Sequence, residues 1–238
     1  MTTSSMSMEA GEVSERIDVL DHGYVRLVES MGSDLSIVRA ARVSYDAAWR
    51  AGEDQGSDHR LIHYLWKNRH TTPFESVVFQ FEVYAPIFVF RQWHRHRTWS
   101  YNELSGRYRE LPAVFYVPDP AVVGEQSTSN KQGRQAGDPG LVEQRRGEVE
   151  QYRAACEASF AEYRKLLDAG WPRELARSVL PVSTYSHMFA KVDLRNLLGF
   201  LDLRADAHAQ HEIRVYAAAM RDLARQVAPV ALAAWEAN

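Results

Sequence analysis

The sequence predicts an α+β fold in a single domain, with a small mixed or antiparallel sheet and several long helices. The chain has 238 residues, which suits one domain with a sizeable core. Stretches of strand-like alternation are few, whereas several stretches carry apolar residues at helical spacing. Strands and helices do not alternate regularly, and the sequence has no internal repeat and no GxGxxG loop. These observations disfavour a Rossmann-type sheet and favour α+β.

The N-terminal part predicts a hairpin followed by two helices. Residues 16–20 and 24–29 are short strand-type runs joined by a turn. A helix is expected over 33–45, with Ser33 as its cap, because a serine oxygen accepts a hydrogen bond from a free N–H group of the first turn. A second helix is expected over about 57–69, with its apolar residues on one face.

The middle part predicts a strand, a helix and a long connection. Residues 77–84 alternate as VVFQFEVY, which is typical of a strand with one buried face. Pro86 fits the first turn of a helix whose C-terminal end would carry the polar residues of 92–96. A short strand is expected over 114–117. Residues 119–140 are polar and aperiodic, so they form either a mobile lid or a disordered insertion.

The C-terminal part predicts a mostly helical arrangement. The expected elements are a helix over 141–169, a short helix over 172–180, a strand over 185–192, a helix capped by Asp193, and a last helix over 206–227. Cys156 lies on the apolar stripe of the first of these helices, which indicates a buried structural thiol. Residues 202–208 are a polar stretch between apolar segments and a second place where chemistry is expected.

Composition and charge exclude several classes of protein. The formal net charge is -3, which argues against general nucleic-acid binding, because such domains carry an excess of Lys and Arg. Cys156 is the single cysteine, which excludes an intramolecular disulfide and indicates a reducing compartment. The sequence has no long apolar run and no signal-peptide pattern. We expect a cytoplasmic protein that does not bind a membrane, with a disordered tail over 1–14 and one domain over 15–238.

The segment 90–108 concentrates positive charge in an acidic protein. It holds four arginines and two histidines, with Glu103 as its one acid. Like charges repel when they are held close together, so such a cluster is costly unless an anion binds it. Aromatic residues alternate with the charges, which disfavours a fully solvated basic loop. Because guanidinium groups bind phosphate through two hydrogen bonds at once, the first interpretation is a pocket for a phosphorylated small molecule.

A metal site is a weaker interpretation. His59 and His63 are four residues apart, and His208 and His211 are three apart, so either pair can share a helix face. The sequence contains no HExxH motif and no evident third ligand. We therefore expect no metal.

Two further interpretations concern the basic segment itself. Ser100 or Ser105 is a candidate nucleophile with His94 or His96 as its base, although neither serine lies in a GxSxG motif. Alternatively, the Arg/Trp-rich residues 91–108 form an RNA-binding module, in which aromatic rings stack on bases and arginines bind phosphates.

Residues 95–108 also carry a recognisable motif. Their sequence, RHRTWSYNELSGRY, has every fixed position of the pattern RHRxxSxNExSxRY. This pattern is the signature of the flavin-dependent thymidylate synthases, which the chain also resembles at 70–75, 85–93, 172–181 and 201–210. The resemblance implies an α+β fold and the synthesis of dTMP from dUMP. It further implies methylenetetrahydrofolate as the carbon donor, NADPH as the reductant, bound FAD, and a homotetramer with active sites shared between subunits.

The resemblance also implies roles for individual residues. For dUMP these are Gln92, Trp93, His94, Arg95, Glu103, Leu104, Ser105, Gly106, Arg107, Arg177 and Arg204. For FAD they are Thr72, Arg95, His96, Arg97, Glu103, Asp193 and Arg195.

The resemblance implies catalytic roles for two residues and shows two departures from the family. Arg204 corresponds to an arginine at the pyrimidine, where a fixed positive charge favours loss of the N3 proton. His70 corresponds to a histidine near the flavin that supports turnover. Gly199 stands where relatives often have a polar side chain facing the flavin, and Ser76 stands where a histidine is common.

Overall fold

The computed structural model describes residues 16–129, 133–135 and 138–237. The strands are β1 (Arg16–Val19), β2 (Gly23–Met31), β3 (Val78–Pro86), β4 (Ser100–Glu103), β5 (Glu125–Gln126), β6 (Arg134–Gln135) and β7 (Tyr185–Asp193). The α-helices are α1 (Asp34–Arg42), α2 (Gln55–Lys67), α3 (Ile87–Trp93), α4 (Val142–Asp168), α5 (Arg173–Ala176), α6 (Leu194–Arg204), α7 (His211–Val227) and α8 (Pro229–Glu236). Short 3₁₀ helices are η1 (Val43–Tyr45), η2 (Ala48–Arg50), η3 (Thr72–Ser76), η4 (Pro120–Val122), η5 (Pro139–Leu141) and η6 (Arg177–Val179). The expected tail over 1–14 lies outside the described residues.

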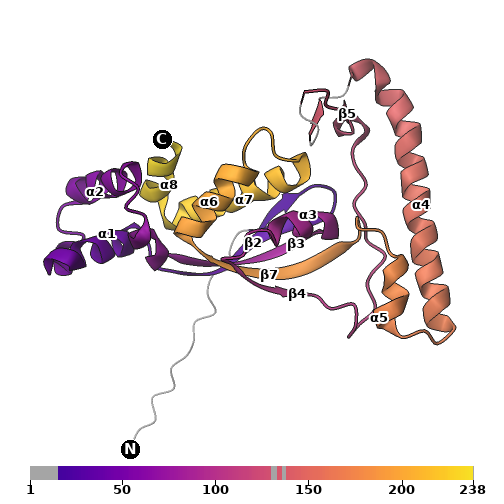
Figure 1. The fold of residues 1–238 in the computed structure, drawn as a ribbon, viewed down its shortest axis with the longest axis horizontal. Helices are drawn as coiled ribbons and strands as arrows, with labels where there is room; N and C mark the ends of the chain where they lie inside the picture. Colours follow the sequence, from indigo (N-terminus) through magenta and orange to yellow (C-terminus); the bar gives the residue numbers. More distant parts are fainter. Residues whose placement is uncertain (1–15, 130–132, 136–137, 238) are drawn as a thin grey trace, which may run out of the picture.

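A twisted sheet with the strand order β1-β2-β3-β7-β4 forms the centre of the protein (Figure 1). Every neighbouring pair in it is antiparallel, which confirms the α+β class. β3 alternates as the sequence predicts. Phe79, Phe81 and Val83 are fully buried, whereas Gln80 and Tyr84 lie on the other face and are partly exposed.

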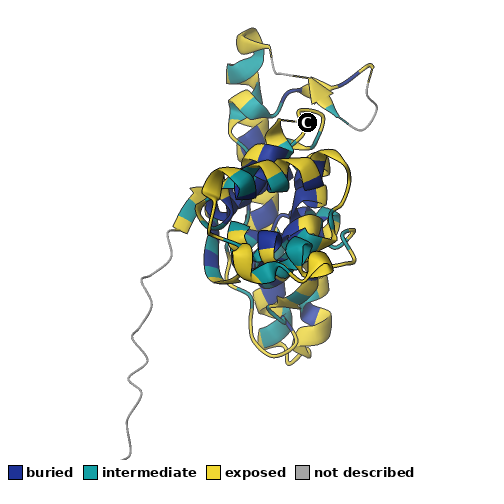
Figure 2. Cartoon of the chain, turned by 90° about the vertical axis from the view of Figure 1, so that its left-hand side faces the viewer, coloured by how far each residue is buried: buried dark blue, intermediate teal, exposed yellow. Residues whose placement is uncertain are grey.

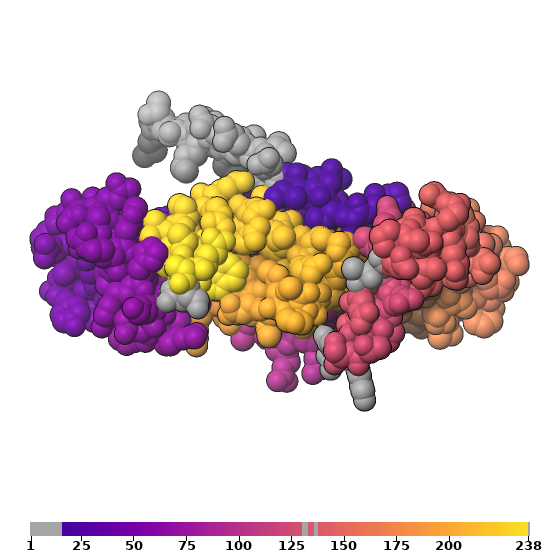
Figure 3. Space-filling model, turned by 90° about the horizontal axis from the view of Figure 1, so that it is seen from above, coloured from indigo at the N-terminus to yellow at the C-terminus, as the bar shows by residue number. Residues whose placement is uncertain are grey.

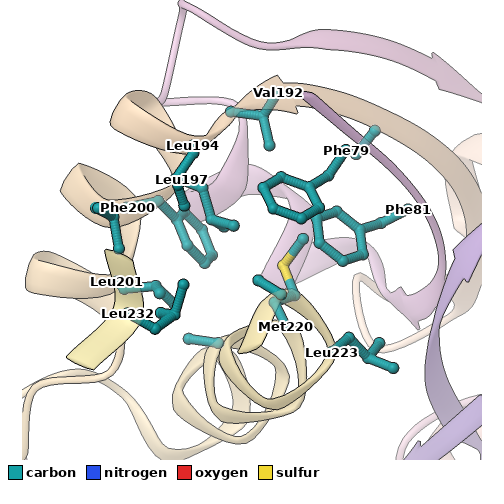
Figure 4. Packing of buried hydrophobic residues seen from close by; sticks show 14 of the residues in the cluster. Phe79, Phe81, Val192, Leu194, Leu197, Phe200, Leu201, Met220, Leu223 and Leu232 are labelled. Carbon is teal, nitrogen blue, oxygen red and sulfur yellow. The ribbon is translucent and has the colours of Figure 1, made fainter. Parts of the chain in front are cut away.

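The main core lies between this sheet and the helices α6, α7 and α8 (Figures 1 and 2). Phe79 and Phe81 of β3 point toward Leu197 of α6 and toward Met220 and Leu223 of α7 (Figure 4). All five side chains are at most 1% exposed. Burying a side chain of this size contributes about 1.5–3 kcal/mol, so this contact fixes how α6 and α7 lie on the sheet.

Two of the predicted helix caps are present. Ser33 is the N-cap residue of α1, and its N–H donates to Ser36 Oγ over 3.1 Å as one half of a capping box. The helix ends at Arg42 and continues as η1 to Tyr45. The Asp193 carboxylate accepts from the Asn196 N–H over 2.9 Å and starts α6 directly after β7. The capping aspartate therefore fixes the point at which the chain turns from the sheet into the helix layer.

The long helix α4 stands apart from the main core, at the opposite end of the molecule from α1 and α2 (Figures 1 and 3). It packs in a small second core in which Phe160 and Tyr163 contact Ala176 and Phe115. Cys156 is 3% exposed, with its sulfur 3.6 Å from Ser183 Oγ, which confirms the prediction of a buried thiol.

Several predicted elements differ from the structure. The expected strand over 114–117 is only an isolated bridge between Phe115 and Thr184, because the flanking Pro112 and Pro118 lack the N–H groups that a longer ladder needs. The last long helix begins at His211 instead of near 206. The sequence interpretation missed α8 and also β4, which lies inside the signature motif.

The predicted helix after Pro86 is also shorter than expected. α3 ends at Trp93, so Arg95 and His96 follow the helix instead of lying on it. The Tyr101 hydroxyl lies 3.1 Å from the Trp93 carbonyl oxygen and 2.8 Å from that of His96, within hydrogen-bond distance of both. The single hydroxyl proton is donated to one of these carbonyl groups at a time, so this side chain from β4 ties the end of α3 and the residues after it to the sheet.

We predict opposite effects for two alanine substitutions. A Cβ atom at Gly23 would lie 1.9 Å from the Tyr216 hydroxyl and 2.8 Å from the Val19 carbonyl oxygen. Gly23→Ala should therefore lower the free energy of unfolding by about 1–3 kcal/mol. The matched control is Gly147→Ala in α4, where nothing lies within 4 Å, and it should raise that free energy by about 0.5–1 kcal/mol. Urea unfolding measures both, and equal effects would contradict the packing at Gly23.

Candidate functional site

The C-terminal ends of α3 and α6 meet at the Arg204 guanidinium. Arg204 Nε donates to His96 Nε2 over 3.0 Å, and its Nη2 donates to the Gln92 carbonyl oxygen over 3.3 Å. Arg204 is the last residue of α6, and Gln92 lies in the last turn of α3. Both helix ends carry partial negative charge, which favours a cation between them. This accounts for a half-buried arginine that has no carboxylate partner among the residues that the structure describes.

His96 is held in its neutral form. Burial lowers the pKa of His96 to about 4, and the positive charge of Arg204 adds to this shift. An arginine can only donate, so Nε2 of His96 is the acceptor and the ring proton lies on Nδ1. Burial also lowers the pKa of Arg204 from its ordinary value. The pair thus carries one positive charge, and no acidic side chain in the described ranges forms an ion pair with it.

A chain of side-chain hydrogen bonds leads from Gln92 into the protein. Gln92 Nε2 donates to Gln210 Oε1 over 2.5 Å, and Gln210 Nε2 donates to Glu212 Oε2 over 2.8 Å. Glu212 is 2% exposed, and its Oε1 accepts from Tyr116 over 3.1 Å and from Arg134 over 2.9 Å. The sequence interpretation missed Gln210 and Glu212. A signal was present, since Glu212 lies four and eight residues before the buried Tyr216 and Met220, on the apolar stripe of α7.

A second group of predicted residues lies at the end of β4. Glu103 Oε1 accepts from the Ser186 hydroxyl over 2.8 Å, which holds this carboxylate against β7. Gly106 is buried where a Cβ atom would come within 3.0 Å of the Arg177 side chain, so the loop can approach Arg177 closely. Arg107 pairs with Glu174 at 3.5 Å.

A third group lies near the start of β3 and the end of β7. Arg195 forms an ion pair with Glu75 of η3, and Asp193 serves as the cap of α6. Thr72 is exposed in η3. His70 is exposed, with its ring edge toward Tyr64 at a centroid distance of 6.2 Å. Within the described ranges, no hydrogen bond or ion pair joins the three groups to one another.

A family profile described as "Thymidylate synthase complementing protein" matches residues 26–230. The chain is 47% identical over 225 residues to a flavin-dependent thymidylate synthase of Treponema denticola, covering 94% of this chain and 83% of that protein. The chain belongs to the flavin-dependent thymidylate synthase family.

Other relatives agree with this membership. The family member of Thermotoga neapolitana is 45% identical over 214 residues, covering 90% of this chain and 91% of that protein. Among solved structures, a UMP/dUMP methylase, PolB from Streptomyces cacaoi bound with 5-Br dUMP, has a TM-score of 0.82 and 41% identity. The match covers 93% of this chain and 97% of that one. The resemblance stated from the signature motif is thereby confirmed.

The residues assigned from this family form three groups instead of one within a single chain. Gln92, His96 and Arg204 lie together, as do Gly106 and Arg177. Trp93 is fully buried in the core, so its side chain supports the helix and does not line an open site. His94 packs its ring against Tyr101 at a centroid distance of 4.9 Å, and Leu104 bonds to β7 through its backbone N–H.

Three exposed arginines are suited to bind an anionic cofactor. The side chains of Arg91, Arg95 and Arg97 make no hydrogen bond or ion pair with any residue in the described ranges. Guanidinium groups without a carboxylate partner are the donors that a pyrophosphate needs. The donor set therefore fits a cofactor such as FAD. Gly199 is exposed on α6 with open space around it, and Ser76 bonds to the Pro73 carbonyl oxygen over 2.6 Å, so both departures are accommodated in their local surroundings.

The other interpretations of the sequence find little support in the geometry. Nε2 of His96 already accepts from Arg204, which removes it as a base for a serine nucleophile. In the part of the chain that the structure describes, no three His, Cys, Asp or Glu side chains gather closely enough to hold a metal ion. No helix in that same part combines the length and the apolar content that crossing a membrane requires.

We predict a measurable pH effect at His96. In ring-proton NMR its midpoint should lie at about pH 4, below the ordinary value of 6.5. Because the folded state disfavours the protonated ring, this group lowers stability as the pH falls from about 6.5 to about 4. Arg204→Gln should raise the midpoint of the His96 titration. The midpoint should stay below the ordinary value of 6.5, because the burial of His96 remains.

The control is Arg164→Gln on the exposed face of α4, which should leave the midpoint unchanged. A wild-type midpoint near the ordinary value, or no response to Arg204→Gln, would contradict the hydrogen bond between Arg204 and His96.

Proposed function

We propose that this protein is an enzyme that makes dTMP from dUMP by reductive methylation. Methylenetetrahydrofolate supplies the carbon, NADPH supplies the electrons, and FAD is the bound cofactor. The observation that carries the proposal is the unneutralised Arg204 charge, which lies beside the signature motif in a member of the flavin-dependent thymidylate synthase family. We also propose a cytoplasmic location, with no nucleic-acid partner.

Arg204 would act on the uracil ring. Its neighbours are the neutral His96 ring and a peptide oxygen, so its charge remains available to a substrate. A fixed cation beside the pyrimidine stabilises the negative charge that develops when the N3 proton is lost, and it makes C5 a better nucleophile. His96 and the end of α3 hold the guanidinium in place, so little reorganisation is needed when dUMP binds.

The phosphate of dUMP would be bound by the group at the end of β4. Arg177 and Arg107 provide guanidinium groups, and the loop from Glu103 to Gly106 provides N–H groups and a serine hydroxyl. The resemblance assigns Gln92 and Arg95 to the same nucleotide. A dianion is the partner that this gathering of cations favours.

The cofactor would be held by Thr72, Arg95, His96, Arg97, Glu103, Asp193 and Arg195, as the resemblance assigns. When bound, FAD supplies electron transfer from NADPH to the transferred carbon, chemistry that no amino-acid side chain provides. The protein contributes cation donors for the pyrophosphate and a rigid frame of sheet and capped helix. His70 would support turnover beside the flavin. Cys156 is buried in the second core and is not suited to attack uracil as a thiolate.

We further propose a homotetramer in which each active site uses residues of several subunits. The separation of the three groups within one chain supports this proposal, since one nucleotide and one cofactor need residues of all three. Exposed apolar side chains also support it: Trp171, Leu175 and Val182, on either side of Arg177, are between 50% and 63% exposed. Apolar surface of this kind is typical of a contact with another protein chain.

The alternative of an RNA-binding module is disfavoured by burial. Trp93 is 0% exposed and Trp99 is 6% exposed, so neither ring is free to stack on a base. Tyr101 is held by the hydrogen bonds of its hydroxyl.

The central experiment measures tritium release from C5-labelled dUMP. The purified protein should bind FAD, appear yellow and bleach with NADPH, and it should release tritium only when FAD, NADPH and methylenetetrahydrofolate are all present. Cys156→Ala should release tritium at a rate close to that of the wild type. A colourless protein that takes up no FAD and binds RNA would overturn the proposal.

Arg204 provides a sharper prediction. Arg204→Ala should lower dTMP formation by about 10²–10³-fold while FAD remains bound, because the fixed charge beside the developing anion is lost. Arg164→Ala is the control for the removal of an arginine and should leave turnover unchanged. If Arg204→Ala instead released FAD and kept full turnover per bound flavin, the assigned role would be wrong.

A further inference from the structure

The buried carboxylate of Glu212 is a charged group that the proposed function does not use. It lies in the first turn of α7 and is 2% exposed. Burying a carboxylate costs free energy unless it is well paired, so its hydrogen-bond partners show how the structure stabilises it. They are Tyr116, Arg134 and Gln210, which come from three different segments of the chain.

Glu212 is held in its ionised form. Burial opposes its ionisation, but hydrogen bonds from the Gln210 side chain and from its own N–H group, together with the charge of Arg134, outweigh burial and keep its pKa below the ordinary value. The start of α7 also favours negative charge. At neutral pH both oxygens of Glu212 therefore accept hydrogen bonds and neither can donate one.

Because the Glu212 carboxylate only accepts hydrogen bonds, it determines the orientation of the Gln210 side-chain amide. A primary amide has a donor end and an acceptor end. Glu212 Oε2 is 2.8 Å from Gln210 Nε2, so Gln210 must direct its NH₂ group toward the carboxylate. Its carbonyl oxygen, Oε1, then faces Gln92.

The same reasoning extends by one residue to Gln92. Gln210 Oε1 can only accept, and Gln92 Nε2 lies 2.5 Å from it. Gln92 must therefore present its NH₂ group to Gln210. Its own oxygen, Oε1, points the other way and accepts no hydrogen bond from any residue in the described ranges. The Gln92 backbone oxygen meanwhile accepts from Arg204, so this residue is fixed at both its main chain and its side chain.

We propose that Glu212 is a positioning residue: through Gln210 it fixes the amide of Gln92, so that Gln92 offers its side-chain oxygen to a hydrogen-bond donor of the nucleotide. The donor is a ring N–H or a sugar hydroxyl, both of which dUMP carries. The inference rests on the proposed function, because it deepens how the same site selects its nucleotide. Glu212 does not touch the nucleotide itself.

The test is a double-mutant cycle on dUMP affinity. Glu212→Gln keeps the shape of the side chain but adds an NH₂ group. The side-chain amides of Gln210 and Gln92 can then each rotate by 180° and exchange their donor and acceptor ends. Equilibrium dialysis of labelled dUMP against the FAD-loaded protein should show affinity about tenfold weaker, the size of one lost hydrogen bond. Gln92→Ala should weaken affinity similarly. The double variant should be no weaker than Gln92→Ala by more than about twofold, because Glu212 acts through Gln92.

Arg134→Gln is the matched control. It removes another partner of Glu212 but leaves the carboxylate as an acceptor for Gln210, so dUMP affinity should stay within about threefold of the wild type. If Glu212→Gln fails to fold, the exposed Gln210→Leu tests the same relay without disturbing the core. Gln210→Leu should weaken dUMP binding about tenfold in the otherwise unchanged protein. In a protein that already carries Gln92→Ala, it should cause no comparable further loss.

The outcomes separate this inference from the proposed function. If the wild type binds dUMP but the effects of Glu212→Gln and Gln92→Ala multiply, Glu212 has only a structural role and the positioning inference is overturned. The same holds if Arg134→Gln weakens binding as much as Glu212→Gln does. A wild-type protein that carries FAD but binds no dUMP overturns both.

Discussion

The antiparallel pairing of β3 with β7 is the constraint on which the rest of the structure depends. Nine residues of each strand pair, from Val78 opposite Asp193 to Pro86 opposite Tyr185. Because the strands run in opposite directions, the helices that follow them start at opposite ends of the pair. α3 begins at one end and α6 at the other, and both run back over the sheet until their C-terminal ends meet.

This geometry explains why the site has its charge. Two helix ends with partial negative charge need a cation between them, and Arg204 supplies it without a carboxylate. A carboxylate partner would have stabilised the arginine, but it would also have cancelled the charge that the proposed role of Arg204 beside the pyrimidine requires. His96 supports the guanidinium through a neutral ring instead. The packing of the two helix ends and the proposed chemistry therefore both require a positive charge at Arg204.

The sequence predicts much of the fold, because its signals are local. Alternation in 77–84, the cap at Asp193 and the apolar stripe of α4 each depend on a few neighbouring residues, and the structure contains all three. β4 was missed because its four residues are mostly polar and are held by pairing with β7, a contact distant in sequence. The end of α3 was missed for the same reason, since the Tyr101 hydroxyl that satisfies it comes from β4.

In the candidate site, too, local sequence signals predict some features, whereas contacts between distant residues cannot be predicted from them. The signature motif identified the family, but no spacing in the sequence indicates that Gln92 reaches Glu212 through Gln210, because the bond from Gln92 to Gln210 joins residues 118 positions apart. The sequence of the basic segment 90–108 likewise does not distinguish a buried Trp93 from an exposed Arg95, since the two residues lie only two positions apart. Residue identity predicts chemistry here, whereas tertiary contacts decide which side chains are free to perform it.

The small second core beneath α4 has a consequence for motion. Phe160, Tyr163 and Ala176 form a cluster separate from the main core, and Arg177 follows directly on from that cluster. Fewer buried residues form this cluster than form the core around β3, so we expect it to open at a lower free energy than global unfolding requires. Arg177, at the proposed phosphate site, is thereby attached to the small second core, which we expect to be the more flexible part. Arg204, at the proposed pyrimidine site, is attached to the larger and more rigid main core.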